Sequence, residues 1–360
     1  MPKNAYIHIP FCKSKCNYCT FVSFDSLEIK KQYLESLSVQ IKSEYKQERL
    51  NTLYFGGGTP SLLSIDEISS VIKLFNFADN PEITVEVNPD SVDKKYLSDL
   101  RKIGVNRLSI GTQTFDDKVL KLIGRRHNSE QVFSALNFAI EAGFDNISLD
   151  FIYGLPTQKM DDFETDLLKA VALPIQHISL YGLKIEEGCH FYKKMPKSLP
   201  DLDLQADMYL KAIEVLKNAG FEHYEVSNFS RSGFNSKHNL NYWDNNSYYG
   251  FGCAASGYDE GIRYQMEPDL LKYISNPISR DFEQELTQGE ILEEEIFLGL
   301  RKLSGINVDK INTKFGINFN EKYAKIIEKY SRYFKKNTNM LAFNDEGILI
   351  SNEILQEFIG

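Results

Sequence analysis

The sequence predicts an α/β fold: a partial (β/α)6 barrel of the TIM type, followed by a small winged-helix-like α+β domain. Three observations predict it. Short apolar runs alternate with longer amphipathic stretches through the first 220 residues. Strands that alternate with helices in this way form parallel sheets. Six such units occur, fewer than the eight of a closed barrel, and the unusual polar residues fall near or just after the ends of the predicted strands.

The six predicted strands are short, and each is followed by a predicted helical stretch. We expect the strands at 6–9, 52–55, 83–87, 107–110, 147–152 and 177–181. The helices are expected at 29–48, 65–76, 93–102, in the stretch that ends at 143, at 160–172 and at 203–219. Ligands of such sheets bind at the carboxyl ends of the strands, so we expect the functional residues at that rim.

The amino-acid composition of the chain changes after about residue 225. Residues 227–258 are rich in Asn, Ser, Tyr and Gly and are predicted to be loop. A helix is expected from 291 to 302, followed by two short helices and a hairpin between 340 and 350. We therefore predict three parts, listed in chain order: a barrel over 1–230, a loop-rich connection over 231–288 and a C-terminal domain over 289–360.

Composition and charge exclude several classes of protein. The 360 residues are 42% hydrophobic and 25% charged, which is enough to bury a sizeable core. The net charge of −9 argues against broad binding to nucleic acid or to anionic membranes. No stretch of about 20 apolar residues is present, so a cytoplasmic location is expected.

Three of the five cysteines crowd into eight positions. Cys12, Cys16 and Cys19 have the spacing C-x3-C-x2-C, whereas Cys189 and Cys253 stand alone. This is a local metal site rather than a disulfide framework. Three thiolates on a [4Fe–4S] cluster leave one iron without a protein ligand, and that iron can bind the amino and carboxylate groups of S-adenosylmethionine (SAM). The alternative is a zinc site with His8 as fourth ligand.

Further polar residues follow the predicted strands. The segment 56–60, Gly-Gly-Gly-Thr-Pro, lets a backbone approach a ligand closely, although a tight turn is the alternative. Glu86, Gln113 and Arg125 lie on or after strands. Asp150 lies inside an apolar run, where a carboxylate is costly unless it finds a partner. It could accept hydrogen bonds from ribose hydroxyls, or it could belong to a structural salt bridge.

One histidine motif stands out in the region predicted as loop. His238-Asn-Leu-Asn-Tyr-Trp243 contains the only tryptophan of the chain. Histidine is a common axial ligand of heme iron, and the aromatic residues would supply apolar faces for the macrocycle. A lone histidine is more often structural, so both interpretations stay open.

Together these motifs resemble the coproporphyrinogen dehydrogenase-like branch of the radical SAM superfamily, and within it the heme chaperones. The resemblance covers nearly the whole chain, and its motifs lie at 6–12, 12–21, 56–61, 85–89, 109–113, 123–127, 149–156, 224–229 and 238–243. It implies a radical SAM barrel with the cluster on Cys12, Cys16 and Cys19. It implies cofactor contacts at Tyr6, Gly57, Gly58, Thr59, Glu86, Gln113, Arg125 (or its neighbour Arg126) and Asp150, and heme binding at His238.

Two features separate the chaperones from the dehydrogenases. The dehydrogenases resemble C-x3-C-x-Phe-C-x-C, with a further cysteine where this chain has Phe21. They also carry an N-terminal extension, whereas this chain reaches its first cluster cysteine at residue 12. One departure concerns Ser256, which stands where the family usually has a histidine; this leaves His238 as the better candidate heme ligand.

Two functions are therefore expected as alternatives. In the first, the protein carries heme to an acceptor hemoprotein, such as a membrane respiratory enzyme. In this case an electron donor such as flavodoxin or ferredoxin serves the cluster, and a homodimer is one expected state. In the second, it is an oxygen-independent coproporphyrinogen III dehydrogenase, or another radical SAM oxidoreductase of porphyrin metabolism. Phe21 and His238 favour the carrier.

Overall fold

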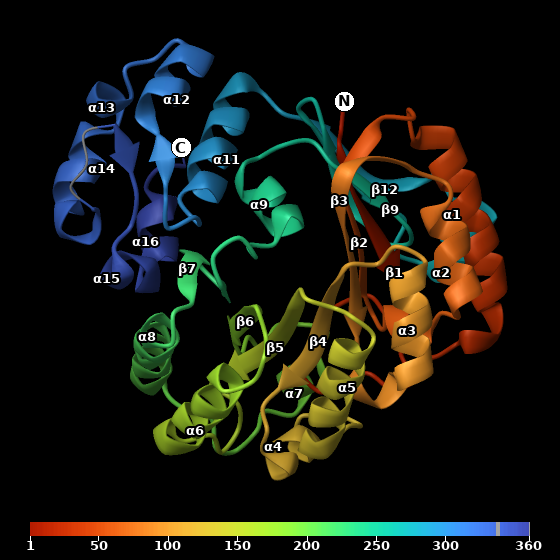
Figure 1. The fold of residues 1–360 in the computed structure, drawn as a ribbon. Coiled ribbons are helices and arrows are strands. Elements are labelled where there is room, and N and C mark those ends of the chain that lie inside the picture. The colour runs from red at the N-terminus through yellow and green to blue at the C-terminus, as the bar shows by residue number, and fades with distance from the viewer. Residues whose placement is uncertain (336–338, 360) are drawn as a thin grey trace.

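The computed structural model describes residues 1–335 and 339–359. A curved nine-stranded sheet dominates it, in the order β7-β8-β6-β5-β4-β3-β2-β1-β9 (Figure 1). The six strands predicted from the sequence are all present and parallel, which confirms the partial (β/α)6 barrel. They are β1 (Asn4–Ile9), β2 (Arg49–Gly57), β3 (Asn76–Val87), β4 (Arg107–Gln113), β5 (Ile147–Tyr153) and β6 (His177–Gly182).

Helices cover the convex side of this sheet (Figure 1). Their starts follow from the sequence: Ser64 and Glu67 form a capping box at one, and Asn128 and Gln131 form another. The helices of the barrel are α1 (Lys30–Glu44), α2 (Ile65–Ile72), α3 (Lys94–Lys102), α4 (Asp117–Leu122), α5 (Ser129–Glu141), α6 (Met160–Val171), α7 (His190–Lys193) and α8 (Leu202–Asn218). Short 3₁₀ turns lie at Leu27–Ile29, Pro60–Leu62 and Pro89–Ser91.

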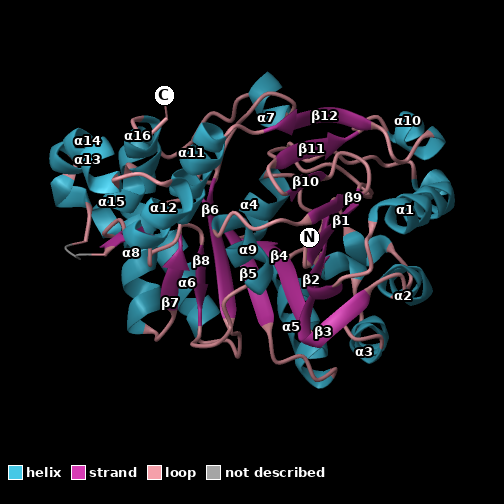
Figure 2. Cartoon of the chain, turned by 90° about the horizontal axis from the view of Figure 1, so that it is seen from above, coloured by secondary structure: helices cyan, strands magenta, loops and turns pink. Residues whose placement is uncertain are grey.

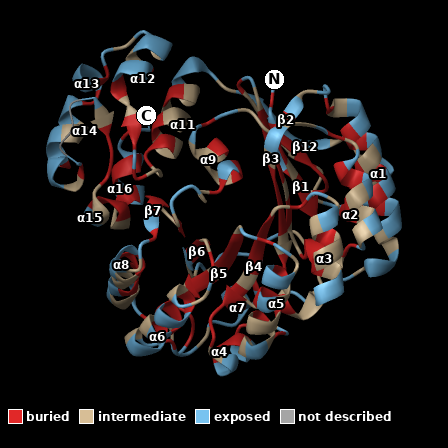
Figure 3. Cartoon of the chain, viewed as in Figure 1, coloured by how far each residue is buried: buried red, intermediate tan, exposed pale blue. Residues whose placement is uncertain are grey.

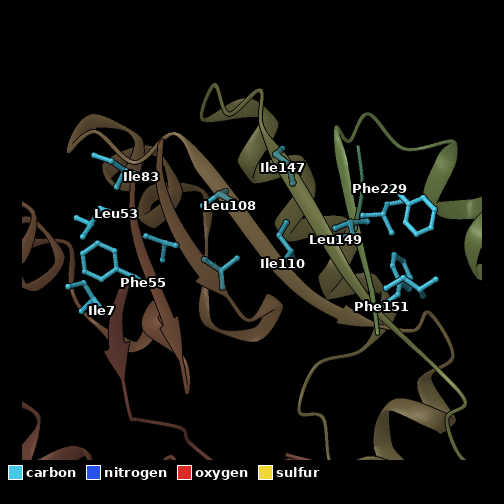
Figure 4. Close-up of a cluster of buried hydrophobic side chains, with 14 of the residues drawn as sticks. Ile7, Leu53, Phe55, Ile83, Leu108, Ile110, Ile147, Leu149, Phe151 and Phe229 are labelled. Carbon is cyan, nitrogen blue, oxygen red and sulfur yellow. The ribbon is translucent and has the colours of Figure 1, made fainter. Parts of the chain in front are cut away.

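The main core lies between the sheet and these helices. Alternate strand residues, such as Ile7, Phe55, Leu108 and Leu149, are buried there (Figure 4). Figure 3 shows the strands buried and the outer helix faces exposed. Because side chains of a strand alternate between its two faces, the other set points into the barrel, and that set is largely polar.

The prediction that residues 227–258 form a loop is wrong. It contains β8 (Asn228–Ser230), α9 (Lys237–Trp243), β9 (Tyr249–Phe251) and the start of β10. The strand β9 adds to β1 at one edge of the sheet, whereas β8, together with β7 (Glu222–Glu225), adds antiparallel to β6 at the other. The strands among these elements are only three or four residues long, and they are ordered by pairing with distant strands rather than by local sequence.

A second, antiparallel sheet packs near β9 and consists of β10 (Ser256–Asp259), β11 (Ile262–Met266) and β12 (Arg280–Glu285) (Figure 2). The helix α10 (Leu270–Ser275) connects β11 to β12. The C-terminal region lies at the opposite edge, beyond β7 and β8. It contains α11 (Gln288–Gly299), β13 (Ile306–Asn307), α12 (Val308–Phe315), α13 (Phe319–Lys322), α14 (Ala324–Lys329), a 3₁₀ turn (Ser331–Tyr333), β14 (Met340–Leu341), α15 (Asp345–Leu349) and α16 (Ser351–Gln356).

The hairpin predicted between 340 and 350 is also wrong. Asn344 accepts a hydrogen bond from the backbone N–H of Gly347 and starts α15, so the second half of the expected hairpin is a helix. β14 pairs instead with β13, which lies more than 30 residues earlier in the chain, and the pairing is antiparallel.

The division into three parts at residues 230 and 288 stays a prediction. No helix among the described residues combines the length and the apolar character that a membrane crossing requires.

Candidate cofactor site

A cavity of about 570 Å³ opens at the carboxyl ends of the barrel strands. Its walls come from the cysteine loop, from the segment after β2 and from the inward faces of β3 to β6. The residues predicted from the sequence that line it are Cys12, Cys16, Cys19, Gly57, Gly58, Thr59, Glu86, Gln113, Arg125 and Asp150. Of the predicted cofactor residues, Tyr6 and His238 do not line it.

The cysteine loop is tied to the barrel by backbone hydrogen bonds. The N–H of Cys12 donates to the carbonyl of Phe24 over 2.9 Å, and the N–H of Asn17 donates to the carbonyl of Ile123 over 2.9 Å. The three cysteines are half-buried. The sulfur of Cys12 lies 3.5 Å from Oγ1 of Thr59, so the loop contacts the segment that follows β2.

Arg125 rather than Arg126 reaches into the cavity. Its guanidinium donates to Oδ1 of Asn88 over 2.7 Å and to the carbonyl of Gly111 over 2.8 Å, and Nη1 lies 3.6 Å from the sulfur of Cys16. Arg126 is exposed and pairs with Asp90 at 3.3 Å. The cation of Arg125 therefore stands beside the thiol that would carry negative charge as a metal ligand.

Two glycines let the backbone run close to its neighbours. Gly57 has φ +106°, and a Cβ on it would lie 2.5 Å from the His8 ring. A Cβ on Gly58 would lie 2.7 Å from the carbonyl oxygen of Phe11. Neither position accepts a side chain, so the backbone here forms part of the cavity wall.

Hydroxyl groups hold the two carboxylates of the cavity. Glu86 accepts a hydrogen bond from Tyr54 over 2.8 Å, and burial raises the pKa of Glu86 to about 7. Asp150 accepts from Ser109 over 2.9 Å and from Ser148 over 3.1 Å, and burial raises the pKa of Asp150. No basic side chain pairs with Asp150 among the described residues, so the structural salt bridge considered above is absent there.

The cavity contains residues that the sequence analysis missed. Tyr54, Arg107 and Ser109 share the inward face of the sheet with Glu86 and Asp150, and all five line the cavity. Their alternation with buried apolar residues along β2 and β4 is the signal that would have found them. Asn88 was also missed; besides accepting from Arg125 it donates to Thr59 over 3.0 Å.

The donor set fits an iron–sulfur cluster better than the zinc alternative. The ring of His8 is already engaged, since Nε2 lies 2.9 Å from the carbonyl oxygen of Val22 and Nδ1 lies 3.0 Å from the Tyr6 hydroxyl. In the described parts of the chain no three His, Cys, Asp or Glu side chains gather closely enough to hold a single metal ion. A cubane needs thiolates set around a larger group, and three thiols on one half-buried loop beside an arginine meet that need.

His238 lies behind the cavity wall, beside Thr52 of β2, while its neighbour Asn239 lines the cavity. The ring is 1% exposed, with Nδ1 2.7 Å from Oγ1 of Thr52 and Nε2 2.7 Å from the Tyr242 hydroxyl. Its backbone N–H donates to Glu82, and its ring stacks on Tyr54 with centroids 5.0 Å apart. Burial lowers the pKa of His238 to about 3. In this conformation α9 plugs the barrel, on the concave side of the sheet in Figure 1, and neither ring nitrogen is free.

Two further residues singled out in the sequence are exposed. The Phe21 side chain is 63% exposed and lines the mouth of the cavity, two positions beyond Cys19. Ser256 is exposed at the start of β10, where it pairs with Gln265 of β11. Ser256 does not line the cavity.

Comparisons with known proteins agree with this architecture. Residues 6–170 match the radical SAM superfamily and residues 286–353 match the HemN C-terminal domain. A coproporphyrinogen III oxidase (HemN) structure from Escherichia coli has the same fold, with a TM-score of 0.88 at 23% identity over 99% of this chain and 90% of that one.

Curated relatives match over most or nearly all of the chain. The heme chaperone HemW of Lactococcus lactis is 38% identical over 99% of this chain and 97% of its own, and that of Bacillus subtilis is 35% identical over 99% of both. The mitochondrial radical S-adenosyl methionine domain-containing protein 1 of Danio rerio is 32% identical over 84% of this chain and 73% of its own. The chain therefore belongs to the HemW family of radical SAM proteins.

Proposed function

We propose that this protein is a heme carrier that binds heme and transfers it to an acceptor hemoprotein. The observation that carries the proposal is the full-length similarity to heme chaperones, at 38% identity over 99% of the chain. An acceptor such as a membrane respiratory enzyme, an electron donor such as flavodoxin or ferredoxin, a homodimeric state and a cytoplasmic location belong to the same proposal and stay predictions.

In the proposal, Cys12, Cys16 and Cys19 hold a [4Fe–4S] cluster. When bound, the cluster supplies single electrons to the sulfonium of SAM. The guanidinium of Arg125, 3.6 Å from the sulfur of Cys16, offsets the negative charge that the thiolates bring into the cavity. Tyr6 supports this site from behind, since its hydroxyl lies 3.0 Å from His8, the residue whose ring packs against Gly57.

SAM is proposed to lie along the rim between the cysteine loop and β5. The backbone of Gly57, Gly58 and Thr59 would bind its amino acid end, because a side-chain-free backbone can approach that group closely. Glu86 and Asp150 are acceptors suited to an ammonium group and to ribose hydroxyls, and each is already positioned by a hydroxyl donor. Gln113, which has φ +67° at a register shift between β4 and β5, adds an amide at the same rim.

Phe21 favours the carrier over the dehydrogenase. The phenyl ring stands at the cavity mouth and can neither ligate a metal nor donate a proton there. A solvent-exposed phenyl ring is instead suited to contact with an apolar macrocycle or with a partner protein.

Heme ligation by His238 requires a rearrangement. Both nitrogens of the ring are engaged at 2.7 Å, so iron can bind only if α9 withdraws from the barrel and breaks the contacts to Thr52 and Tyr242. We therefore propose that heme loading at this residue is coupled to movement of α9.

Two assays on the cluster-loaded protein test the carrier proposal under anaerobic conditions. The heme-loaded protein should pass its heme to an apo-hemoprotein faster than bound heme dissociates spontaneously from a His238→Ala variant. Incubation with coproporphyrinogen III, SAM and reductant should yield no protoporphyrinogen. Formation of protoporphyrinogen, with no heme transfer, would establish the dehydrogenase instead.

A further inference from the structure

A chain of three side chains connects the sulfur atoms of two cysteines at the rim of the cavity. Nη1 of Arg125 lies 3.6 Å from the Cys16 sulfur, and Nη2 donates to Oδ1 of Asn88 over 2.7 Å. The amide of Asn88 donates onward to Oγ1 of Thr59 over 3.0 Å, and that oxygen lies 3.5 Å from the Cys12 sulfur. Asn88 therefore links the surroundings of Cys16 to those of Cys12.

Asn88 is held in a fixed place at the end of β3. It precedes Pro89, which restricts it to an extended backbone, and it has φ −92° and ψ 136°. Its N–H donates to Oγ of Ser61 over 3.2 Å, and its carbonyl accepts from Oγ of Ser91 over 2.7 Å. Because the backbone is anchored in this way, the side chain stays between Arg125 and Thr59.

The direction of each hydrogen bond in this chain follows from Arg125. A guanidinium has N–H donors and no acceptor, so it can face only the oxygen of the Asn88 amide. The NH2 group of Asn88 is thereby turned to Thr59, and because this group can only donate, the Thr59 oxygen accepts. The hydroxyl of Thr59 then keeps its own proton for another acceptor, and the Cys12 sulfur lies within reach.

The hydroxyl that ends this chain is shielded from water. Thr59 is 5% exposed, and its N–H donates to the carbonyl of Phe11 over 2.8 Å, which fixes its backbone beside the cysteine loop. A hydrogen bond to an anionic sulfur is stronger in such surroundings than in water. Because reduction adds negative charge to an iron–sulfur cluster, a donor to one of its sulfurs stabilises the reduced form and raises the reduction potential.

We propose that Asn88 is a positioning residue, which orients the Thr59 hydroxyl as a donor to the Cys12 thiolate and thereby raises the reduction potential of the cluster. The inference rests on the proposed function for the cluster itself, and it adds a role for a residue that acts through its neighbours. The alternative is a brace that only holds the segments after β2 and β3 together. Such a brace would not depend on which atom of the amide faces Thr59.

Redox titration of the full-length, cluster-loaded protein, followed by electron paramagnetic resonance, tests the proposal. Asn88→Asp keeps an acceptor for Arg125 but replaces the NH2 group by a second acceptor, so the Thr59 hydroxyl turns away from Cys12. At a fixed solution potential the ratio of reduced to oxidised cluster should fall about tenfold, which is about 59 mV for one electron. Thr59→Val should lower the ratio about fivefold, whereas Thr59→Ser keeps the hydroxyl and should stay within about twofold of wild type.

A double variant separates the turned hydroxyl from the added charge. If Asn88→Asp acts through Thr59, the ratio in Asn88→Asp/Thr59→Val should fall about tenfold, well short of the product of about fiftyfold for independent effects. The matched control is Asn17→Asp, next to Cys16, where the native side chain donates to the carbonyl of Leu122 rather than to a hydroxyl. Its effect should multiply with that of Thr59→Val.

Two measurements on the same samples, iron and sulfide content and urea unfolding, assign the other outcomes. Independent effects in the Asn88/Thr59 double variant would overturn the inference and leave the proposed cofactor standing. So would an unchanged potential in Asn88→Asp with an intact cluster; a loss of stability there would assign the brace. If Asn88→Asp takes up no cluster, equal potentials in Thr59→Val and Thr59→Ser would overturn the inference, and unequal ones would support it. A wild-type protein that takes up no iron and sulfide would overturn the proposed cofactor, and this inference with it.

Discussion

At Gly57 the backbone leaves no room for a side chain, and the consequence can be measured against a matched glycine. Gly57→Ala brings a Cβ to 2.5 Å from the His8 ring at φ +106°, whereas Gly143→Ala at φ +83° meets nothing within 4 Å. The φ strain should cost about 1–2 kcal/mol in both variants, and the clash should add about 1–3 kcal/mol to Gly57→Ala alone.

Urea unfolding measures these free-energy costs, and calorimetric titration measures the affinity for SAM. Affinity for SAM should fall only in Gly57→Ala. If both variants lose the same stability and bind SAM as wild type does, the glycine segment is an ordinary turn, which is the alternative reading of its sequence.

The two neighbouring arginines make a second residue-level comparison. Arg125→Lys removes a planar donor that reaches Asn88, Gly111 and Cys16 together, so the reconstituted cluster should be less stable and its electron paramagnetic resonance signal should shift. Arg126→Lys keeps a charge beside Asp90 at the surface and should leave both unchanged. The opposite order of effects would exchange the roles assigned to the two residues.

At the scale of elements, α9 is a plug whose removal should be costly. His238→Ala leaves the Tyr242 hydroxyl without its partner inside the barrel, removes one of the two hydrogen bonds of Thr52 and opens a cavity. We expect the free energy of unfolding to fall by about 2–4 kcal/mol. His190→Ala, at an exposed position on α7, should change it by less than about 0.5 kcal/mol.

The same variant separates the two roles considered for His238. A loss of stability together with a changed Soret spectrum of bound heme supports both the plug and the iron ligand. If stability falls and the heme spectrum is that of wild type, His238 is structural only, and another residue binds the iron.

The elements that the sequence predicted well are those whose pattern is local. The apolar runs of β1 to β6 and the capping residues Ser64 and Asn128 sit inside the segments they define. β8, α9 and β9 were missed because their order depends on distant partners: Glu82, for example, accepts the N–H groups of Lys237 and His238. The hairpin expected near 345 was missed because Asn344 acts as a helix cap rather than as a turn residue.

In the candidate site, too, residues with a local sequence signal were predicted, and residues positioned only by the fold were missed. The cysteines, the glycine segment and Asp150 are recognisable by spacing or by standing out in an apolar run. Asn88 and Arg107 are ordinary in sequence, and only the register of β3 to β5 brings them to the cavity. The position of His238, buried behind Tyr54 with both ring nitrogens engaged, could not be predicted from its motif.

At the scale of the whole molecule, Glu225 lies where the barrel meets the C-terminal region. Its backbone forms an isolated antiparallel β-bridge with Lys302, and the N–H of the adjacent Val226 donates to the carbonyl of Arg301 over 2.9 Å. Glu225 is 0% exposed, and burial raises its pKa to about 7. The folded state therefore holds a proton that the unfolded state releases above about pH 4.5, so this carboxyl lowers stability as pH rises from about 4.5 to 7.

Urea unfolding over that pH range checks the sign. Glu225→Gln should gain stability relative to wild type as pH rises, by up to about 3 kcal/mol between pH 4.5 and 7.5. Glu222→Gln, on the exposed end of the same strand, should show a difference that does not depend on pH. A difference for Glu225→Gln that is flat or falls with pH would mean that the carboxylate is ionised and well paired in the folded protein.

The central claim is that one chain binds both a cluster with SAM and heme. Its most direct test is an anaerobic heme titration of the cluster-loaded protein, followed by absorption spectroscopy with and without SAM. The account predicts a shifted Soret band that saturates near one heme per chain, with heme affinity altered by SAM. An unshifted Soret band at every heme concentration, with the cluster intact by iron and sulfide content, would contradict it.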